Sequence, residues 1–166
     1  MANKQSFTPD EWIKILESPV LTGMAVSAAD PNGLWGTIKE AVASRSAISA
    51  SMREPSSSEL IRTVIADFQS GEGRTAIQDA LQKRLSGAKP ADIVQRSLAN
   101  LREVSAIVDE KAPDDAADFK AWLRGIGQRV AEASLEGGFL GIGGVRVSEA
   151  EKATLADIER ALSAPA

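Results

Sequence analysis

The amino-acid sequence predicts an all-α fold, a single-domain compact bundle of about seven or eight helices. Signals that start a helix recur along the 166 residues, and apolar residues follow each signal at helical spacing. No strand-like alternation of convincing length is present, the short run 145–147 being the nearest. The composition agrees, because it is 43% hydrophobic but only 4% aromatic, and a core built from alanine and leucine favours helix over sheet.

The first helix is predicted to begin at Thr8 and Pro9. Thr8 is a typical N-cap, Pro9 suits the first helical position, and Glu11 stands three residues after Thr8, where it completes a capping box. We expect this helix to stop near Ser18. A second, short apolar helix then begins with Ser18 and Pro19.

The next two helices are predicted from similar signals. Asp30 and Pro31 repeat the combination of cap and proline and predict a longer helix that reaches Ile48. The segment 55–58, a proline followed by three serines, marks the break after it. The segment 56–59 is a capping box and opens an amphipathic helix that includes Phe68.

The rest of the chain continues in this way. The segment 70–73 separates the previous helix from one that extends to Gly87. Pro90 and Pro113 each mark the start of a longer helix, and the box 148–151 opens the last one.

The domain organisation follows from the length. Residues 1–166 fit one helical domain with a sizeable core. Within it, residues 1–54 are a candidate N-terminal helical arm, which would pack on a main bundle of residues 55–166 or on a second subunit.

The absence of histidine and cysteine limits the chemistry. It removes disulfides, thiolate nucleophiles, catalytic triads with histidine and the usual zinc ligands. No catalytic motif stands out among the 23 acidic residues, so we assign no catalytic residue and no cofactor. The remaining chemistry would have to use carboxylates, lysine, serine, threonine or a cofactor.

Charge and hydropathy bear on partners and location. The net charge is −4, and 19 basic residues are interspersed with the acidic ones, which disfavours nucleic acid as a partner. The longest uncharged stretch, 18–29, is too short and too polar to span a membrane, and residues 1–7 do not resemble a signal peptide. We therefore expect a cytoplasmic protein.

The glycine-rich segment 136–144 is the most distinctive local feature. It does not match the phosphate-binding or dinucleotide-binding loops, because no strand precedes it and no Gly-Lys-Ser/Thr ending follows. The favoured interpretation is a helix C-cap followed by a tight apolar turn. The alternatives are a docking patch formed by Phe139, Leu140 and Ile142, or a phosphate cradle.

Gly125 and Gly127 interrupt a strong helical pattern, where each costs about 1 kcal/mol relative to alanine. Ala117, Ala121 and Gly125 fall on one line of small residues, which favours close approach of another helix. A kink or the wall of a ligand pocket beside Trp122 are the alternatives.

Acidic residues gather where two predicted helices meet. Such carboxylates are weak candidates for a Mg²⁺ or Ca²⁺ site, although their spacing does not match a calcium loop, and a solvated turn is the favoured interpretation. The five residues are Asp109, Glu110, Asp114, Asp115 and Asp118.

Three segments of the last third, 119–123, 137–141 and 147–152, resemble a family of small bacterial all-helical proteins with the pattern GGFLGxGG followed by VSxAE. The resemblance implies a bacterial source and a helical fold, but no activity. Residues 144–151 are also similar to tellurite-resistance B-like helical domains. Here Gly143 stands where that pattern has an acidic residue, so no metal role is carried over.

Two functional hypotheses remain. The first is a non-catalytic helical interaction or scaffold protein that self-associates, because catalytic residue types are missing while apolar helical faces are abundant. The second is a carboxylate-based protein that binds a metal or a small ligand, with a Mg²⁺-dependent enzyme as its catalytic form.

Overall fold

The computed structural model describes residues 2–29, 48–53, 58–136 and 147–163. Within these ranges the chain is helical and has no strand, so the predicted all-α class is confirmed. The elements are the short 3-10 helix η1 (Lys4–Ser6) and the α-helices α1 (Pro9–Ala29), α3 (Glu59–Gln69), α4 (Gly71–Leu85), α5 (Pro90–Lys111), α6 (Pro113–Glu136) and α7 (Glu149–Ser163). Most of the helix predicted from Pro31 to Ile48 lies outside the described residues.

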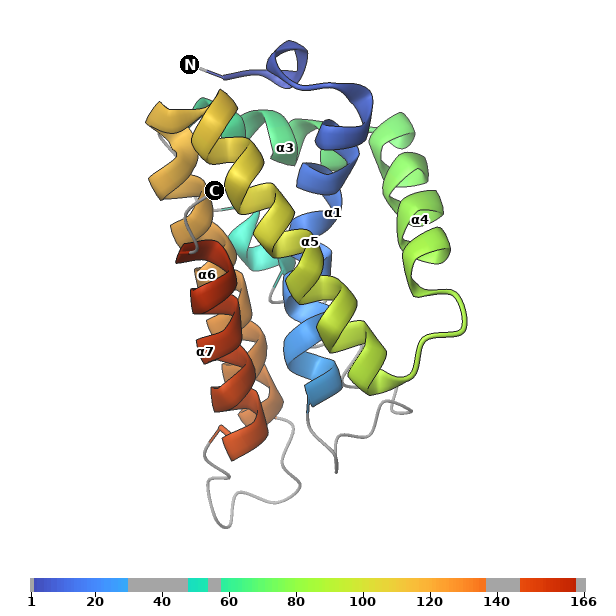
Figure 1. Cartoon of the computed structure of the whole chain (residues 1–166), viewed down its shortest axis with the longest axis vertical. Coiled ribbons are helices and arrows are strands. Elements are labelled where there is room, and N and C mark those ends of the chain that lie inside the picture. Colours follow the sequence, from blue (N-terminus) through green and yellow to red (C-terminus); the bar gives the residue numbers. More distant parts are fainter. Residues whose placement is uncertain (1, 30–47, 54–57, 137–146, 164–166) are drawn as a thin grey trace.

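Helix α1 is the centre of the bundle. It contacts each of α3, α4, α5, α6 and α7, and α5 is its main neighbour. Figure 1 shows α5, α6 and α7 around it, with α3 across one end of the bundle and α4 along one side. The described start of the segment 1–54 therefore packs inside the bundle.

The core is aliphatic, as the composition predicts. Its largest fully buried side chains come from every long helix except α4: Ile15, Leu16, Leu21, Leu60, Leu98, Leu101, Phe119, Leu123, Ile126, Ile158 and Leu162. Helix α4 buries only Gly73 and Ile77, so apolar packing holds it less firmly than the others. Among the described helices, none combines the length and the apolar character that a membrane span requires.

The predicted break at Ser18 is wrong, because α1 continues through Pro19 to Ala29. Proline has no N–H to donate to the carbonyl four residues earlier, which is that of Ile15. The hydroxyl of Ser18 donates to the Ile15 oxygen instead, at 2.7 Å. A side-chain donor thus takes the place of the missing backbone donor, and the helix does not end.

The predicted helix starts at Pro9, at Pro90, at Pro113 and at the box 148–151 are confirmed. Helix α3 is capped by Ser58, whose hydroxyl accepts from the Ile61 N–H, and not by the predicted box 56–59. The Thr8 N–H donates to Glu11 Oε2 at 2.7 Å, and the Glu11 N–H donates to Thr8 Oγ1 at 3.3 Å, which is the expected capping box. Ser148 and Glu151 form the same reciprocal pair at the start of α7. Gly87 ends the α4 segment with a left-handed backbone, at a φ of 66°.

The predicted line of small residues on α6 contacts no other helix within the part of the chain that the structure describes. Ala117 and Ala121 are exposed, and a Cβ placed on Gly125 would meet no atom within 4 Å. The close approach occurs instead at the buried Gly127, where a Cβ would lie 3.3 Å from Leu155 and 3.4 Å from Thr22. The prediction found the right helix but chose the wrong face of it.

Candidate ligand pocket

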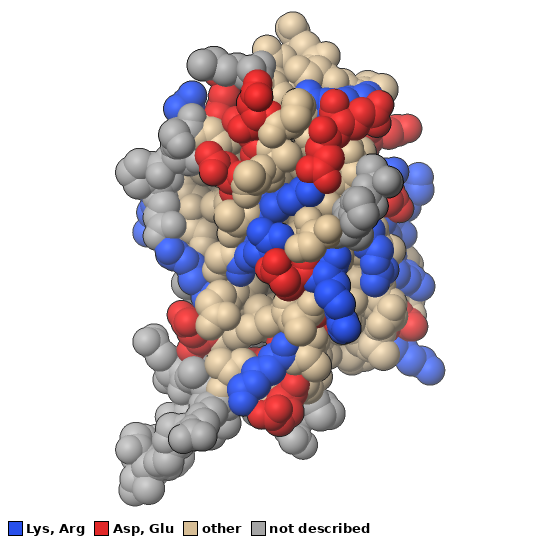
Figure 2. Space-filling model, turned by 60° about the vertical axis from the view of Figure 1, so that its left-hand side comes forward, with Lys and Arg blue, Asp and Glu red and all other residues tan. Residues whose placement is uncertain are grey.

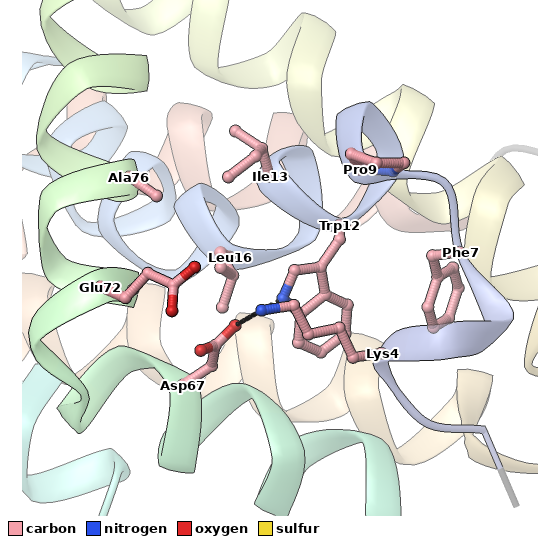
Figure 3. Close-up of a pocket in the computed structure, with 10 residues that line it drawn as sticks. Lys4, Phe7, Pro9, Trp12, Ile13, Leu16, Asp67, Glu72 and Ala76 are labelled. Atoms are coloured by element: carbon pink, nitrogen blue, oxygen red, sulfur yellow. Dashed lines mark hydrogen bonds and ion pairs between the residues drawn. The ribbon is translucent and has the colours of Figure 1, made fainter.

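A pocket of about 290 Å³ lies where η1, the start of α1, the end of α3 and the start of α4 meet (Figure 3). This volume is at the lower limit for small-molecule sites. Its walls combine apolar and charged side chains: Lys4, Phe7, Pro9, Trp12, Ile13, Leu16, Asp67, Glu72, Gly73 and Ala76.

The turn between α3 and α4 positions two of its carboxylates. Ser70 ends α3, where its N–H donates to the carbonyls of Ala66 and Asp67, and it also caps α4, where its hydroxyl accepts from the Gly73 N–H at 2.8 Å. Gly73 lies against the end of α3 so closely that a Cβ would stand 1.9 Å from the Asp67 carbonyl oxygen. Only glycine fits at this position. The close contact places the first turn of α4 beside the end of α3, and Glu72 therefore lies opposite Asp67.

Asp67 is the best-connected polar group of the pocket. Its Oδ2 accepts from the indole N–H of Trp12 at 2.6 Å and from the Lys4 ammonium at 3.0 Å. Partial burial raises the pKa of the Asp67 carboxyl, but the hydrogen bonds from Trp12 and Lys4 outweigh burial and set the pKa below its ordinary value. The carboxylate is therefore charged at neutral pH.

Glu72 is exposed and has no hydrogen bond or ion pair with any described residue. Figure 3 shows its carboxylate pointing into the pocket, toward Asp67 and Leu16. Two carboxylates thus face an apolar wall with Lys4 as the single basic side chain of the lining. The excess negative charge favours a ligand that carries positive charge.

A second polar cluster anchors the far end of α4. Arg84 donates from Nε to Glu17 Oε1 at 2.8 Å and also from Nη2, and Asn100 donates to the same oxygen at 3.0 Å. Glu17 is only 1% exposed. The cluster joins α4 to α1 and α5, so we interpret it as a structural anchor.

The five acidic metal candidates do not converge. Asp109 binds the Lys120 ammonium at 2.6 Å, while Glu110, Asp114 and Asp118 lie exposed. In the described ranges, no three acidic side chains come close enough to share a metal ion.

Asp115 stands apart from the other four because it is buried. Its carboxylate accepts from the Ala2 N–H at 3.2 Å, the Ser58 hydroxyl at 2.8 Å and the Glu59 N–H at 3.1 Å. Burial raises the pKa of the Asp115 carboxyl, and these hydrogen bonds outweigh it and lower the pKa. Asp115 therefore holds the start of α3 and the N-terminal segment in place.

The docking patch proposed for Phe139, Leu140 and Ile142 lies outside the described residues. Sequence analysis did not identify Asp67 and Glu72, because nothing local separates them from the other acidic residues. The nearest signal was Gly73, which we interpreted only as part of a helix break.

Comparison with protein-family models, with curated proteins and with solved structures found no match for this chain.

Proposed function

We propose that this chain is a non-catalytic binding protein that takes a small organic cation with an apolar body in the Trp12–Asp67 pocket. The observation that carries the proposal is the pair of carboxylates, Asp67 and Glu72, beside apolar side chains and a single lysine. Such a wall offers hydrogen-bond acceptors to an ammonium group and apolar surface to the rest of the ligand.

The character of the chain supports binding over catalysis. The sequence has no histidine, which is the commonest general base, and no cysteine, which supplies the thiol nucleophile. Figure 2 shows basic and acidic side chains interspersed over one face of the bundle, a pattern unlike the basic field that attracts nucleic acid.

The test is a binding assay with three molecules of one shape and different charge: phenethylammonium, 2-phenylethanol and phenylacetate. We expect phenethylammonium to bind most tightly and phenylacetate least, measured by calorimetry. A ligand at about 100 times its Kd also raises the free energy of unfolding by about 2.7 kcal/mol, which thermal unfolding detects. Equal binding of the three, or none, would contradict the proposal.

Matched variants locate the site. Glu72→Gln removes the unpaired carboxylate and should weaken phenethylammonium binding, because the ammonium loses an acceptor of opposite charge. Asp79→Asn removes the same charge from an exposed position on the same helix and should leave the Kd unchanged. If Mg²⁺ alone stabilises the protein and Glu72→Gln abolishes that effect, the pocket is a metal site and the proposal is wrong.

The other inferences from sequence remain predictions. A self-associating scaffold is tested by light scattering with size-exclusion chromatography, where a strict monomer at all concentrations would contradict it. The cytoplasmic location and the bacterial family resemblance likewise remain predictions.

A further inference from the structure

Lys4 forms an ion pair with Asp67 inside the pocket. Its ammonium lies 3.0 Å from Asp67 Oδ2, the oxygen that also accepts from Trp12. From the described residues, the other oxygen, Oδ1, accepts only a long hydrogen bond of 3.4 Å, from the Ser70 hydroxyl. Figure 3 shows the Lys4 side chain extended along Trp12 toward this carboxylate.

The backbone around Lys4 is fixed on both sides. Ala2 is buried and donates its N–H to Asp115, and Phe7 is buried against Trp12, with ring centroids 5.8 Å apart. Between them, Asn3 and Ser6 close a capping box around η1. The segment therefore stays on the bundle whether or not the lysine side chain holds Asp67.

The Lys4 side chain, by contrast, has freedom to move. It is 54% exposed, and the ion pair with Asp67 is its one polar contact within the described residues. Exposed ion pairs of this kind contribute about 0.2–1 kcal/mol, because water screens the charges and a long side chain must be ordered. A rotation of the side chain into solvent is enough to release Asp67.

We propose that Lys4 is a built-in competitor for the pocket, whose ammonium is displaced from Asp67 by the ammonium group of the ligand. This inference rests on the function proposed above. It narrows the ligand class to compounds with a hydrogen-bonding ammonium, because a quaternary ammonium has no N–H to replace those of Lys4.

The opposite role for Lys4 is a contribution to binding, in which its ammonium contacts an anionic group of a zwitterionic ligand. The two roles predict changes of opposite sign in the Kd when Lys4 is removed. Removing a competitor tightens the binding of an organic cation, whereas removing a contact weakens the binding of a zwitterion. The sign of the change in Kd therefore separates them.

The experiment compares phenethylammonium binding to the full chain and to three variants by calorimetry. We expect Lys4→Gln to lower the Kd about twofold to fivefold, which corresponds to the strength of an exposed ion pair. Lys4→Arg keeps the competing charge and should retain the original Kd. Lys83→Gln removes one positive charge from an exposed position on α4 and controls for net charge.

The outcomes separate the two proposals. If the original chain and Lys4→Gln bind phenethylammonium with the same Kd, or if Lys4→Gln binds more weakly, Lys4 is not a competitor, although the pocket still binds the cation. If neither binds it, the proposed function fails, and the competitor role fails with it. A tetramethylammonium titration gives the second readout, since binding equal to that of phenethylammonium would overturn the requirement for N–H donors.

Discussion

Arg84 of α4 and Glu17 of α1 form the ion pair that fastens the least buried helix to the centre of the bundle. The Arg84 guanidinium donates twice to Glu17 Oε1, and its side chain is 25% exposed, whereas that of Glu17 is 1% exposed. Glu17 Oε2 has no hydrogen-bond partner among the described residues, so Arg84 supplies the opposite charge and Asn100 a further donor through one oxygen. The pair thus joins an interior charge to a helix that apolar packing holds only weakly.

We expect Arg84→Ala to lower the free energy of unfolding by about 3 kcal/mol, because it leaves the buried Glu17 carboxylate without its charge partner. Urea denaturation measures the change. Arg74→Ala, at an exposed position of the same helix, should change stability by less than about 0.5 kcal/mol. Replacing both partners, Glu17→Leu with Arg84→Leu, should recover most of the loss, and a double variant as unstable as Arg84→Ala would contradict this explanation.

Asp115 should make stability depend on pH on the acid side. Its pKa in the folded protein lies below the unfolded value of about 3.9, so its contribution is complete above that value and is lost as the pH falls through the folded pKa. We expect Asp115→Asn to cost about 2 kcal/mol at pH 7, since three donors lose a charged acceptor. The difference from the original chain should shrink toward pH 3.

The measurement is urea unfolding at several pH values between about 3 and 7, a range that runs from neutrality to below the ordinary aspartate pKa of about 3.9. Asp114→Asn is the matched control, because Asp114 is the exposed neighbour of Asp115 in the same first turn of α6. It should keep the original dependence on pH. A constant difference between Asp115→Asn and the original chain at all pH values would show that the carboxylate charge is not what holds the segment.

The helix caps could be predicted from the sequence, whereas the contacts of Asp67 and Asp115 could not. Thr8 with Glu11 and Ser148 with Glu151 interact across three residues, so a local motif is enough to find them. Asp67 meets Trp12 across 55 positions, and Asp115 meets Ala2 across 113. Such contacts depend on how the helices pack, and periodicity shows which face is apolar but not which helix covers it.

Gly125 and Gly127 give a comparison within one helix. Replacing either glycine by alanine adds about 0.5–1 kcal/mol to the free energy of unfolding, because alanine has the higher helix propensity and makes the unfolded chain less flexible. At Gly125 the new methyl group meets open space, so we expect Gly125→Ala to stabilise the protein by this amount. At Gly127 the methyl group presses on Leu155 and Thr22, at 3.3 and 3.4 Å, and overpacking offsets the gain.

Thermal or urea unfolding of the two variants tests this. Gly127→Ala should be less stable than Gly125→Ala by about 1–2 kcal/mol. Equal stabilities would mean that α1 and α7 do not approach α6 at Gly127 as closely as described.

Ser18 and Pro19 provide a prediction about coupling. Ser18→Ala should cost about 1–2 kcal/mol, because the buried carbonyl of Ile15 loses its hydroxyl donor and Pro19 offers no N–H in its place. In a Pro19→Ala background the backbone N–H of residue 19 is restored and donates to that carbonyl, so Ser18→Ala should cost almost nothing. The two substitutions are therefore coupled, and a double-mutant cycle by urea denaturation measures the coupling as about 1 kcal/mol.

Ser105→Ala is the control for this cycle. Its hydroxyl is also buried and also donates to a backbone carbonyl, that of Leu162 at 3.1 Å, but it lies on α5 and contacts α7. Its cost should be the same with Pro19 or Ala at position 19, because the two sites share no partner. If Ser18→Ala behaves like Ser105→Ala, with equal costs in both backgrounds, the Ser18 hydroxyl stabilises α1 by packing alone and does not replace the donor that Pro19 lacks.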